Sequence, residues 1–368
     1  MGPANKLIVV MLVGAGLASA ADRWNLSYFY DKPEENFDIA DIQCPSAGHC
    51  IAAGAVEQET KFKPSAVLTA DAGAHWTPVH ITDLPTSLFF LNANLGWMAA
   101  DKGIWQTQDG GQTWKKLHGE HDVRRLFFTD ENHGFALQGD KLLRTENGGS
   151  SWAEVASVRT ELAKSPSEVA LEWIWFSDAR NGEIVGEMSP AGANRIPAWL
   201  EPSRARPSGK ATDVIEIGLT TDGGATWTFS AVPRTDDLID VVFSRGEPPW
   251  FIFQPSGAES TSEIARYDRT TNQMNVVLRD TDALVADAIA SGGTTWVAAI
   301  ARQGRLLNLP VPGKLRLYSG PDFEHMDRTD VDYRAVARRA QFAVDGQGAV
   351  FLATDTGMIL KLARNAEH

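Results

Sequence analysis

The eight residues TQDGGQTW at 107–114 give the clearest indication of the fold, because close copies of them recur along the chain. The copies are TADAGAHW at 69–76, TENGGSSW at 145–152 and TTDGGATW at 220–227. Their terminal tryptophans stand 38, 38 and 75 residues apart, and a period near 40 residues indicates stacked structural units. The shared positions are Thr69, Asp71, Gly73, Trp76, Thr107, Asp109, Gly111, Trp114, Thr145, Asn147, Gly149, Trp152, Thr220, Asp222, Gly224 and Trp227.

Each copy has the composition of a hairpin turn. The Asp or Asn can accept backbone N–H bonds, the Gly supplies a positive φ, and the Trp buries a large face. The repeat extends upstream, where LFFLNANLGW at 88–97 aligns without a gap with LFFTDENHGF at 126–135. The unit is therefore four short strands, and no segment has the periodicity of a long amphipathic helix, so we predict an all-β fold.

Four-stranded units of this length close on themselves as a β-propeller. The boxes predict blades at about 37–80, 86–119, 122–158 and 170–232, and three later apolar segments without a box bring the total to seven. Six or eight blades are the alternatives. The last unit stops after a third strand at 358–363, and the strand at 24–30 is placed to complete it. Residues 21–368 then form one propeller domain with an insertion at 188–213.

The composition excludes several classes of function. The 368 residues include 34 Lys or Arg and 47 Asp or Glu, a formal net charge of −13, which argues against binding nucleic acid or anionic lipid. Residues 1–20 have the pattern of a secretory signal peptide, with Lys6 before an apolar run and Ala18-Ser19-Ala20 at the cleavage site. We expect a periplasmic or secreted protein with no membrane insertion after cleavage, and a monomer.

Cys44 and Cys50 are the two cysteines of the chain, and apolar runs flank them on both sides. In an oxidising compartment a structural disulfide that brackets a hairpin turn is favoured. A redox-active pair is the alternative, although the CxxC spacing and the βαβ context typical of such thiols are missing.

The motif [ST]-x-[DN]-x-G-x-x-W is the Asp-box, or BNR repeat. With the preceding F-x-[DN]-x-x-x-G-[WF] strands, the chain resembles the photosystem II stability/assembly factor-like propellers over residues 37–232. This resemblance implies an exported seven-bladed, non-enzymatic scaffold that binds a partner protein in the assembly or stability of a cell-envelope complex. No cofactor is expected. Paired cysteines in the first turn of blade one are also similar to those of box propellers.

Two groups of residues are candidates for binding the partner. The insertion at 188–213 is expected on the face opposite the boxes, where long loops usually carry binding residues, and it holds Arg195, Trp199, Arg204 and Arg206. Its alternative is a solvated loop. The innermost strands contain charged interruptions that alternation can aim at the central channel, namely Asp38, Asp41, Arg124, Arg125, Glu172, Asp240, Asp287, Arg338 and Arg339.

A sialidase-like glycoside hydrolase is the alternative function, since sialidases carry the same box. Such an enzyme needs three Arg, a Tyr–Glu nucleophile pair and an Asp acid/base. The one match to its arginine motif is Asn194-Arg195-Ile196-Pro197, placed after three boxes, and Tyr267 beside Arg266 is the best candidate nucleophile. No catalytic residue is therefore assigned. The histidines lack ligand spacing, so no metal site is expected.

Overall fold

The computed structural model describes residues 23–118, 121–165, 168–188, 213–234, 236–244, 247–255, 261–301, 313–331 and 335–363. The predicted signal peptide and nearly all of the predicted insertion at 188–213 lie outside the described residues. In the part that is described, no helix is both long and apolar enough to cross a membrane.

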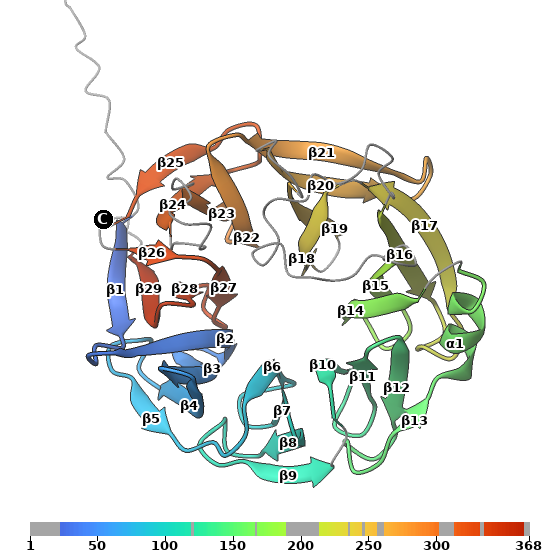
Figure 1. The fold of residues 1–368 in the computed structure, drawn as a ribbon, viewed down its shortest axis with the longest axis horizontal. Coiled ribbons are helices and arrows are strands. Elements are labelled where there is room, and N and C mark those ends of the chain that lie inside the picture. Colours follow the sequence, from blue (N-terminus) through green and yellow to red (C-terminus); the bar gives the residue numbers. More distant parts are fainter. Residues whose placement is uncertain are drawn as a thin grey trace, which may run out of the picture.

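The chain forms seven antiparallel sheets arranged in a ring, which confirms the all-β, seven-bladed prediction (Figure 1). The four box-bearing blades have these strands: blade 1, β2 (Glu35–Ser46), β3 (His49–Gln58), β4 (Lys61–Thr69) and β5 (Thr77–Val79); blade 2, β6 (Pro85–Phe90), β7 (Gly96–Ala100), β8 (Gly103–Thr107) and β9 (Lys115–His118); blade 3, β10 (Val123–Phe128), β11 (Gly134–Gln138), β12 (Lys141–Thr145) and β13 (Ala153–Glu154); blade 4, β14 (Val169–Phe176), β15 (Gly182–Met188), β16 (Asp213–Thr220) and β17 (Thr228–Arg234).

The remaining blades follow the same order from the centre outward. Blade 5 has β18 (Asp237–Ser244), β19 (Glu247–Gln254), β20 (Ser262–Asp268) and β21 (Gln273–Asp280); blade 6 has β22 (Ala283–Ser291), β23 (Thr294–Ala301), β24 (Gly313–Gly320) and β25 (Asp327–Asp330). The short strand β26 (Val336–Ala337) also pairs with β24.

Blade 7 closes the ring by combining both ends of the described chain. It contains β27 (Ala340–Val344), β28 (Val350–Thr354) and β29 (Met358–Ala363), and β1 (Arg23–Phe29) pairs with β29 as its outermost strand. The register aligns Arg23 with Ala363 and Phe29 with Met358. The predicted completion of the last blade by the first strand is thus confirmed.

Apolar clusters lie between neighbouring blades and hold the ring together. Between blades 2 and 3, Trp97 stacks on Phe128 with ring centroids 3.6 Å apart, and between blades 3 and 4, Phe135 stacks on Phe176 at 4.8 Å. Trp97, Phe128 and Phe135 are at most 2% exposed. Since burying such a ring stabilises a fold by about 1.5–3 kcal/mol, each blade depends on its neighbours.

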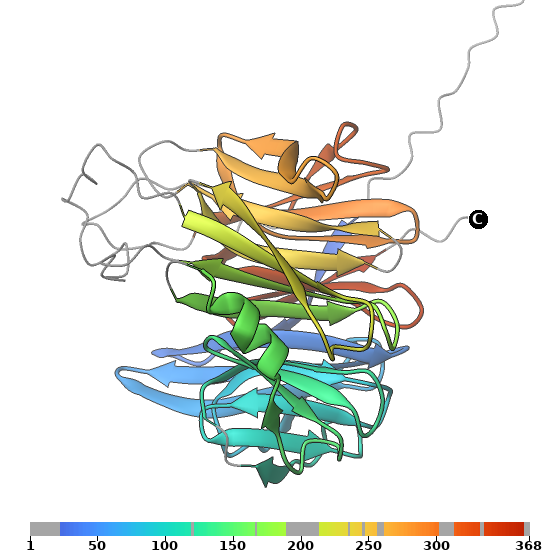
Figure 2. The same ribbon diagram turned by 90° about the vertical axis from the view of Figure 1, so that its right-hand side faces the viewer.

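Two local features differ from the sequence-based expectations. A short helix, α1 (Ala156–Leu162), leads from blade 3 to blade 4 on the outside of the ring, where Val158 and Leu162 are buried (Figure 2). The sequence also predicts a long connection at 57–64, between the second and third strands of blade 1. This segment is instead the tip of a continuous hairpin, because β3 and β4 pair up to Gln58 and Lys61. Glu59 takes a φ of 56° in this tight turn.

The topology separates the turns onto two faces. Every innermost strand runs from one face to the other, so the turns between first and second strands share a face with those between third and fourth strands. We call this the box face, because it carries the four boxes and the Cys44–Cys50 turn. The opposite face, where the innermost strands begin, is called the cavity face.

Candidate functional site

The four boxes share one hydrogen-bond pattern, which assigns them a structural role. In each, the Thr hydroxyl donates to the Asp or Asn side chain two residues on, and it accepts the N–H of the box glycine. The Asp or Asn oxygen also accepts the backbone N–H four residues on, as in His75 to Asp71 at 2.8 Å. This bond and a second one between the His75 ring Nδ1 and Asp71 at 2.7 Å lower the pKa of the Asp71 carboxyl to about 2.

The box tryptophans complete the turns. Trp114, Trp152 and Trp227 each donate their indole N–H to the carbonyl of their own box glycine at 3.1 Å. Trp76 differs, because it donates to the Ser27 hydroxyl at 2.9 Å, which in turn donates to the Gly73 carbonyl at 2.7 Å. Ser27 lies on β1, so the closing strand is tied to the first box.

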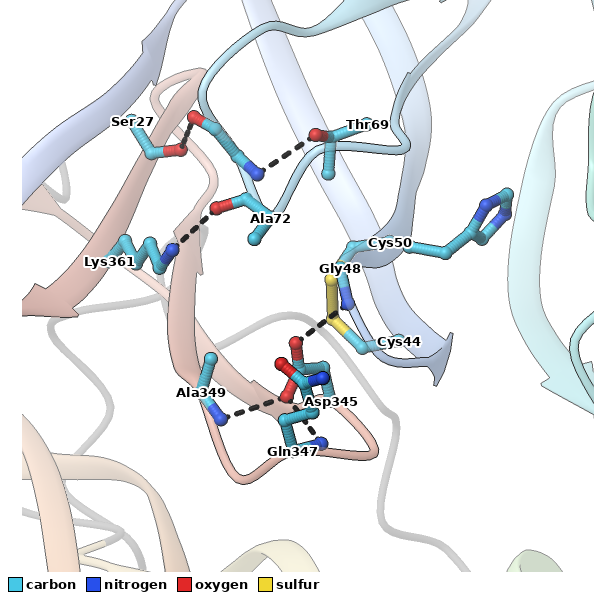
Figure 3. The surroundings of a disulfide bond; sticks show 12 residues. Ser27, Cys44, Gly48, Cys50, Thr69, Ala72, Asp345, Gln347, Ala349 and Lys361 are labelled. Carbon is cyan, nitrogen blue, oxygen red and sulfur yellow. Dashed lines mark hydrogen bonds between the residues drawn. A yellow bond between two sulfur atoms is a disulfide. The ribbon is translucent and has the colours of Figure 1, made fainter.

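The disulfide turn connects three blades, as Figure 3 shows in part. Cys44 and Cys50 form a disulfide, as predicted, around the β2–β3 turn. In that turn, the Gly48 N–H donates to Asp345 of blade 7 at 2.9 Å, and the Gly48 carbonyl accepts the Ala72 N–H of the first box at 2.8 Å. His49 Nε2 donates to the Gly110 carbonyl of blade 2 at 2.7 Å. The turn therefore fixes blade 1 to both neighbours.

A cavity of about 500 Å³ opens at the centre of the ring, near the cavity face. It is shaped by β-bulges at the same place in six of the seven innermost strands, and a bulge turns two successive side chains toward one side. Consequently both Arg124 and Arg125 line the cavity, although simple alternation would aim only one of them inward. The bulges lie at Ile39/Asp41, Pro85/Ser87, Val123/Arg125, Leu171/Trp173, Leu238/Asp240 and Val285/Asp287.

The four predicted channel arginines all line the cavity, and each forms an ion pair with a carboxylate. Three of these guanidinium side chains are about two-fifths exposed and that of Arg339 is 62% exposed, whereas the carboxylates lie deeper. The wall thus presents guanidinium groups that are oriented by acids behind them. The pairs are Arg124–Glu172, Arg125–Asp240 (3.7 Å), Arg338–Asp355 (2.8 Å) and Arg339–Asp38 (2.5 Å).

Two predicted channel acids, Asp41 and Asp287, are buried and join blades. Asp41 accepts the Leu88 N–H of blade 2 at 2.7 Å, and Asp287 accepts the Phe342 N–H of blade 7 at 2.6 Å. Burial raises the pKa of both carboxyls, and for Asp287 the nearby Asp240 charge adds to that rise. Their bonds to backbone amides of the next blade make them structural acids.

The other predicted site residues lie partly within and partly outside the described part of the chain. Arg195, Trp199, Arg204 and Arg206 lie outside the described residues. Tyr267 is buried on blade 5, where its hydroxyl donates to Asn272 at 2.8 Å. Within the described part of the chain, no group of three His, Cys, Asp or Glu side chains is arranged to hold a metal ion.

Sequence reasoning missed several lining residues because they are neutral. Thr86, Ser87, Ile239 and Gln341 all line the cavity, and Ile239 is 40% exposed there. Thr86, Ser87 and Ile239 occupy or neighbour the same bulge positions as the charged residues, whereas Gln341 lies on β27, which pairs with β28 without a bulge. An alignment of the innermost strands with one another would have exposed this repeated pair of inward positions.

Comparison with known proteins supports the fold. No protein-family model and no curated protein matches the chain. Among solved structures, YCF48 from Cyanidioschyzon merolae aligns with a TM-score of 0.58 at 13% identity, over 92% of this chain and 98% of that one. At this identity the likeness establishes a shared seven-bladed propeller and no more.

Other functional classes share the same architecture. The GH74 xyloglucanase from Xanthomonas campestris aligns with a TM-score of 0.59 at 12% identity, covering 92% of this chain and 53% of the enzyme. This chain therefore spans about half of that enzyme. The extracellular domain of a protein described as a one-component system from B. thetaiotaomicron aligns with a TM-score of 0.60 at 10% identity, over 94% of this chain and 40% of that one. The fold alone does not select among these functions.

Proposed function

We propose that this propeller is a non-enzymatic scaffold that binds a partner protein of the cell envelope through its central cavity. The observation that carries the proposal is the set of guanidinium groups of Arg124, Arg125, Arg338 and Arg339 around one opening. Arg is favoured at protein interfaces, and a guanidinium held by a carboxylate loses little freedom on binding.

The partner segment is expected to carry acidic or amide groups. Arg124 and Arg339 are the arginines to test, because neither contacts a fully buried acid and both are partly exposed. The likeness to YCF48, which covers nearly the whole of both chains, is consistent with a scaffold role, and the predicted signal peptide and the disulfide are consistent with an exported protein.

The test compares the chain with a cavity variant and a surface control. The Arg124→Gln/Arg339→Gln protein should lose a specific envelope protein that the wild type retains in affinity capture. Arg159→Gln is the control, because Arg159 lies on α1, is 77% exposed and is paired with Glu154 at 3.9 Å. The captured protein is then purified and its Kd measured against all three. Equal capture by all three would refute a role for the cavity.

The hydrolase alternative is tested on the same proteins. The scaffold proposal expects no turnover of a fluorogenic sialoside by the wild-type chain. Turnover that disappears in the cavity variant and persists in Arg159→Gln would replace the scaffold with a glycoside hydrolase.

A further inference from the structure

The joint between blades 4 and 5 is built differently from the joints that contain a box. In a box joint, a large apolar residue of the second strand packs under the box glycine of the next blade. A Cβ added to the glycine would lie 2.5–3.6 Å from that side chain. The joined residues are Phe351 with Gly73, Ile51 with Gly111, Trp97 with Gly149 and Phe135 with Gly224.

At blade 4 the corresponding residue is Glu183. The register places it where blade 3 has Phe135, since Gly182 pairs with Phe176 as Gly134 pairs with Phe128. Blade 5 has no box to cover it, because β20 and β21 pair up to Asp268 and Gln273 and leave only a short turn. Arg269 from this turn instead forms an ion pair with Glu183.

The short turn leaves a cavity of about 690 Å³ on the box face, which is the size of a small-ligand site. Burial raises the pKa of the Glu183 carboxyl, and the opposing charge of Arg269 limits that rise. Three carboxylates and two guanidiniums line the cavity, namely those of Glu183, Glu247, Asp268, Arg266 and Arg269. This balance does not favour an anionic ligand.

The walls combine a rigid aromatic ring with polar groups. Trp175 lines the cavity and stacks on Phe243 with ring centroids 5.7 Å apart and an interplanar angle of 10°. Asn275 is exposed in the wall, and the Nε of Arg266 is buried without a hydrogen-bond partner. A ligand with C–H faces for the indole and paired hydroxyls for amide, carboxylate and guanidinium groups fits this wall.

We propose that the cavity between blades 4 and 5 is a binding site for a neutral oligosaccharide. The site goes beyond the proposed scaffold function, since it lies on the opposite face of the ring from the central arginines. The cavity lies where a box stands in the other joints, and Glu183, at the position of an apolar residue in those joints, makes its wall polar.

The test is isothermal titration calorimetry of the full chain with chitotetraose and cellotetraose. We expect saturable binding of at least one of them, and about tenfold or greater weakening in Arg269→Gln, since hydrogen bonds to charged groups contribute about 1.5–3 kcal/mol. Asn275→Ala, which changes an exposed side chain, should weaken binding severalfold without loss of folding.

Arg279→Gln is the matched control. Arg279 forms an ion pair with Glu263 on the same blade, and their side chains are 66% and 13% exposed. The corresponding values for Arg269 and Glu183 are 56% and 14%, so the two pairs are similarly exposed, but Arg279 lies outside this cavity. Its affinity should equal that of the wild type. The proposal is overturned if neither tetrasaccharide binds, if Arg279→Gln weakens binding as much as Arg269→Gln, or if the anionic probe sialyllactose binds more tightly than both.

Discussion

Replacing the box glycine Gly224 by alanine tests whether the boxes join blades as well as turn the chain. Gly224 has a φ of +84°, which disfavours any residue with a Cβ. An added Cβ would also lie 2.5 Å from Cζ of Phe135 in blade 3. Phe135 is 2% exposed and stacked on Phe176, so its ring has little room to move.

The two costs can be separated with a second glycine. Gly293 in the β22–β23 turn has a φ of +76°, and an added Cβ there meets no atom within 4 Å. Gly293→Ala should therefore lower the free energy of unfolding by about 1–2 kcal/mol for the backbone alone. Gly224→Ala adds an overpacking cost of about 1–3 kcal/mol, for a total of about 2–5 kcal/mol.

Urea unfolding followed by tryptophan fluorescence measures both variants against the wild type. The entropic effect of alanine on the unfolded chain is common to the two, so it cancels in their difference. Equal destabilisation would show that the box glycine serves only the turn, and it would refute the inter-blade role inferred from the contact with Phe135.

Three further predictions concern the boxes, the disulfide turn and a buried acid. Thr107→Val should cost about 1–3 kcal/mol by leaving the buried Gly111 N–H unpaired, whereas Thr107→Ser should be nearly neutral; equal urea midpoints would contradict this. Cys44→Ser/Cys50→Ser should lower the free energy of unfolding by about 2 kcal/mol, since the disulfide closes a loop with a sequence separation of 6. A double-mutant cycle that combines this change with Asp345→Ala should give a coupling energy of at least about 0.5 kcal/mol, and additive effects would show that the disulfide and Asp345 do not stabilise the turn together. Burial raises the folded-state pKa of Asp287 above 3.8, so the stability that its protonated carboxyl contributes is fully present below pH 3.8 and is lost as the pH rises through the folded-state pKa. The Tm of Asp287→Asn relative to wild type should therefore increase from pH 4 to pH 7. A Tm difference that stays constant with pH would contradict the raised pKa.

The sequence was sufficient to predict the repeat, the blade count and the ring closure. Box residues specify a turn through local hydrogen bonds, so their repeated pattern in the sequence directly predicts the repeated turns of the fold. The turn between β24 and β25 of blade 6 was not predicted as a box, because it lacks the Thr, Gly and Trp of the motif. Gly320 lies opposite Thr295 as Thr107 lies opposite Gly96, and Asp322 stands two residues later, like a box Asp. Asp322 accepts the N–H groups of Glu324 and His325, two and three residues on, whereas a box Asp accepts the N–H four residues on.

The sites were harder to predict, because they depend on backbone irregularities. The charged residues of the channel were identified, but the bulges that turn Arg124 and Arg125 to the same side leave no mark in a pattern of alternation. The cavity between blades 4 and 5 arises from a missing turn, and only the register reveals that Glu183 replaces an aromatic residue.

The pairing of β1 with β29 sets the order in which the molecule can be completed. Six blades each contain strands that are consecutive in the chain, so they can pair as soon as their own residues are available. The seventh has to wait, because its outermost strand is the first of the described strands and its partner is the last. Contacts so distant in sequence form slowly. We therefore expect an open, six-bladed arc to be the last species before the native ring, with the hydroxyl of Ser27 and the amine of Lys361, which donates to the Ala72 carbonyl at 2.7 Å, among the final groups to find their partners.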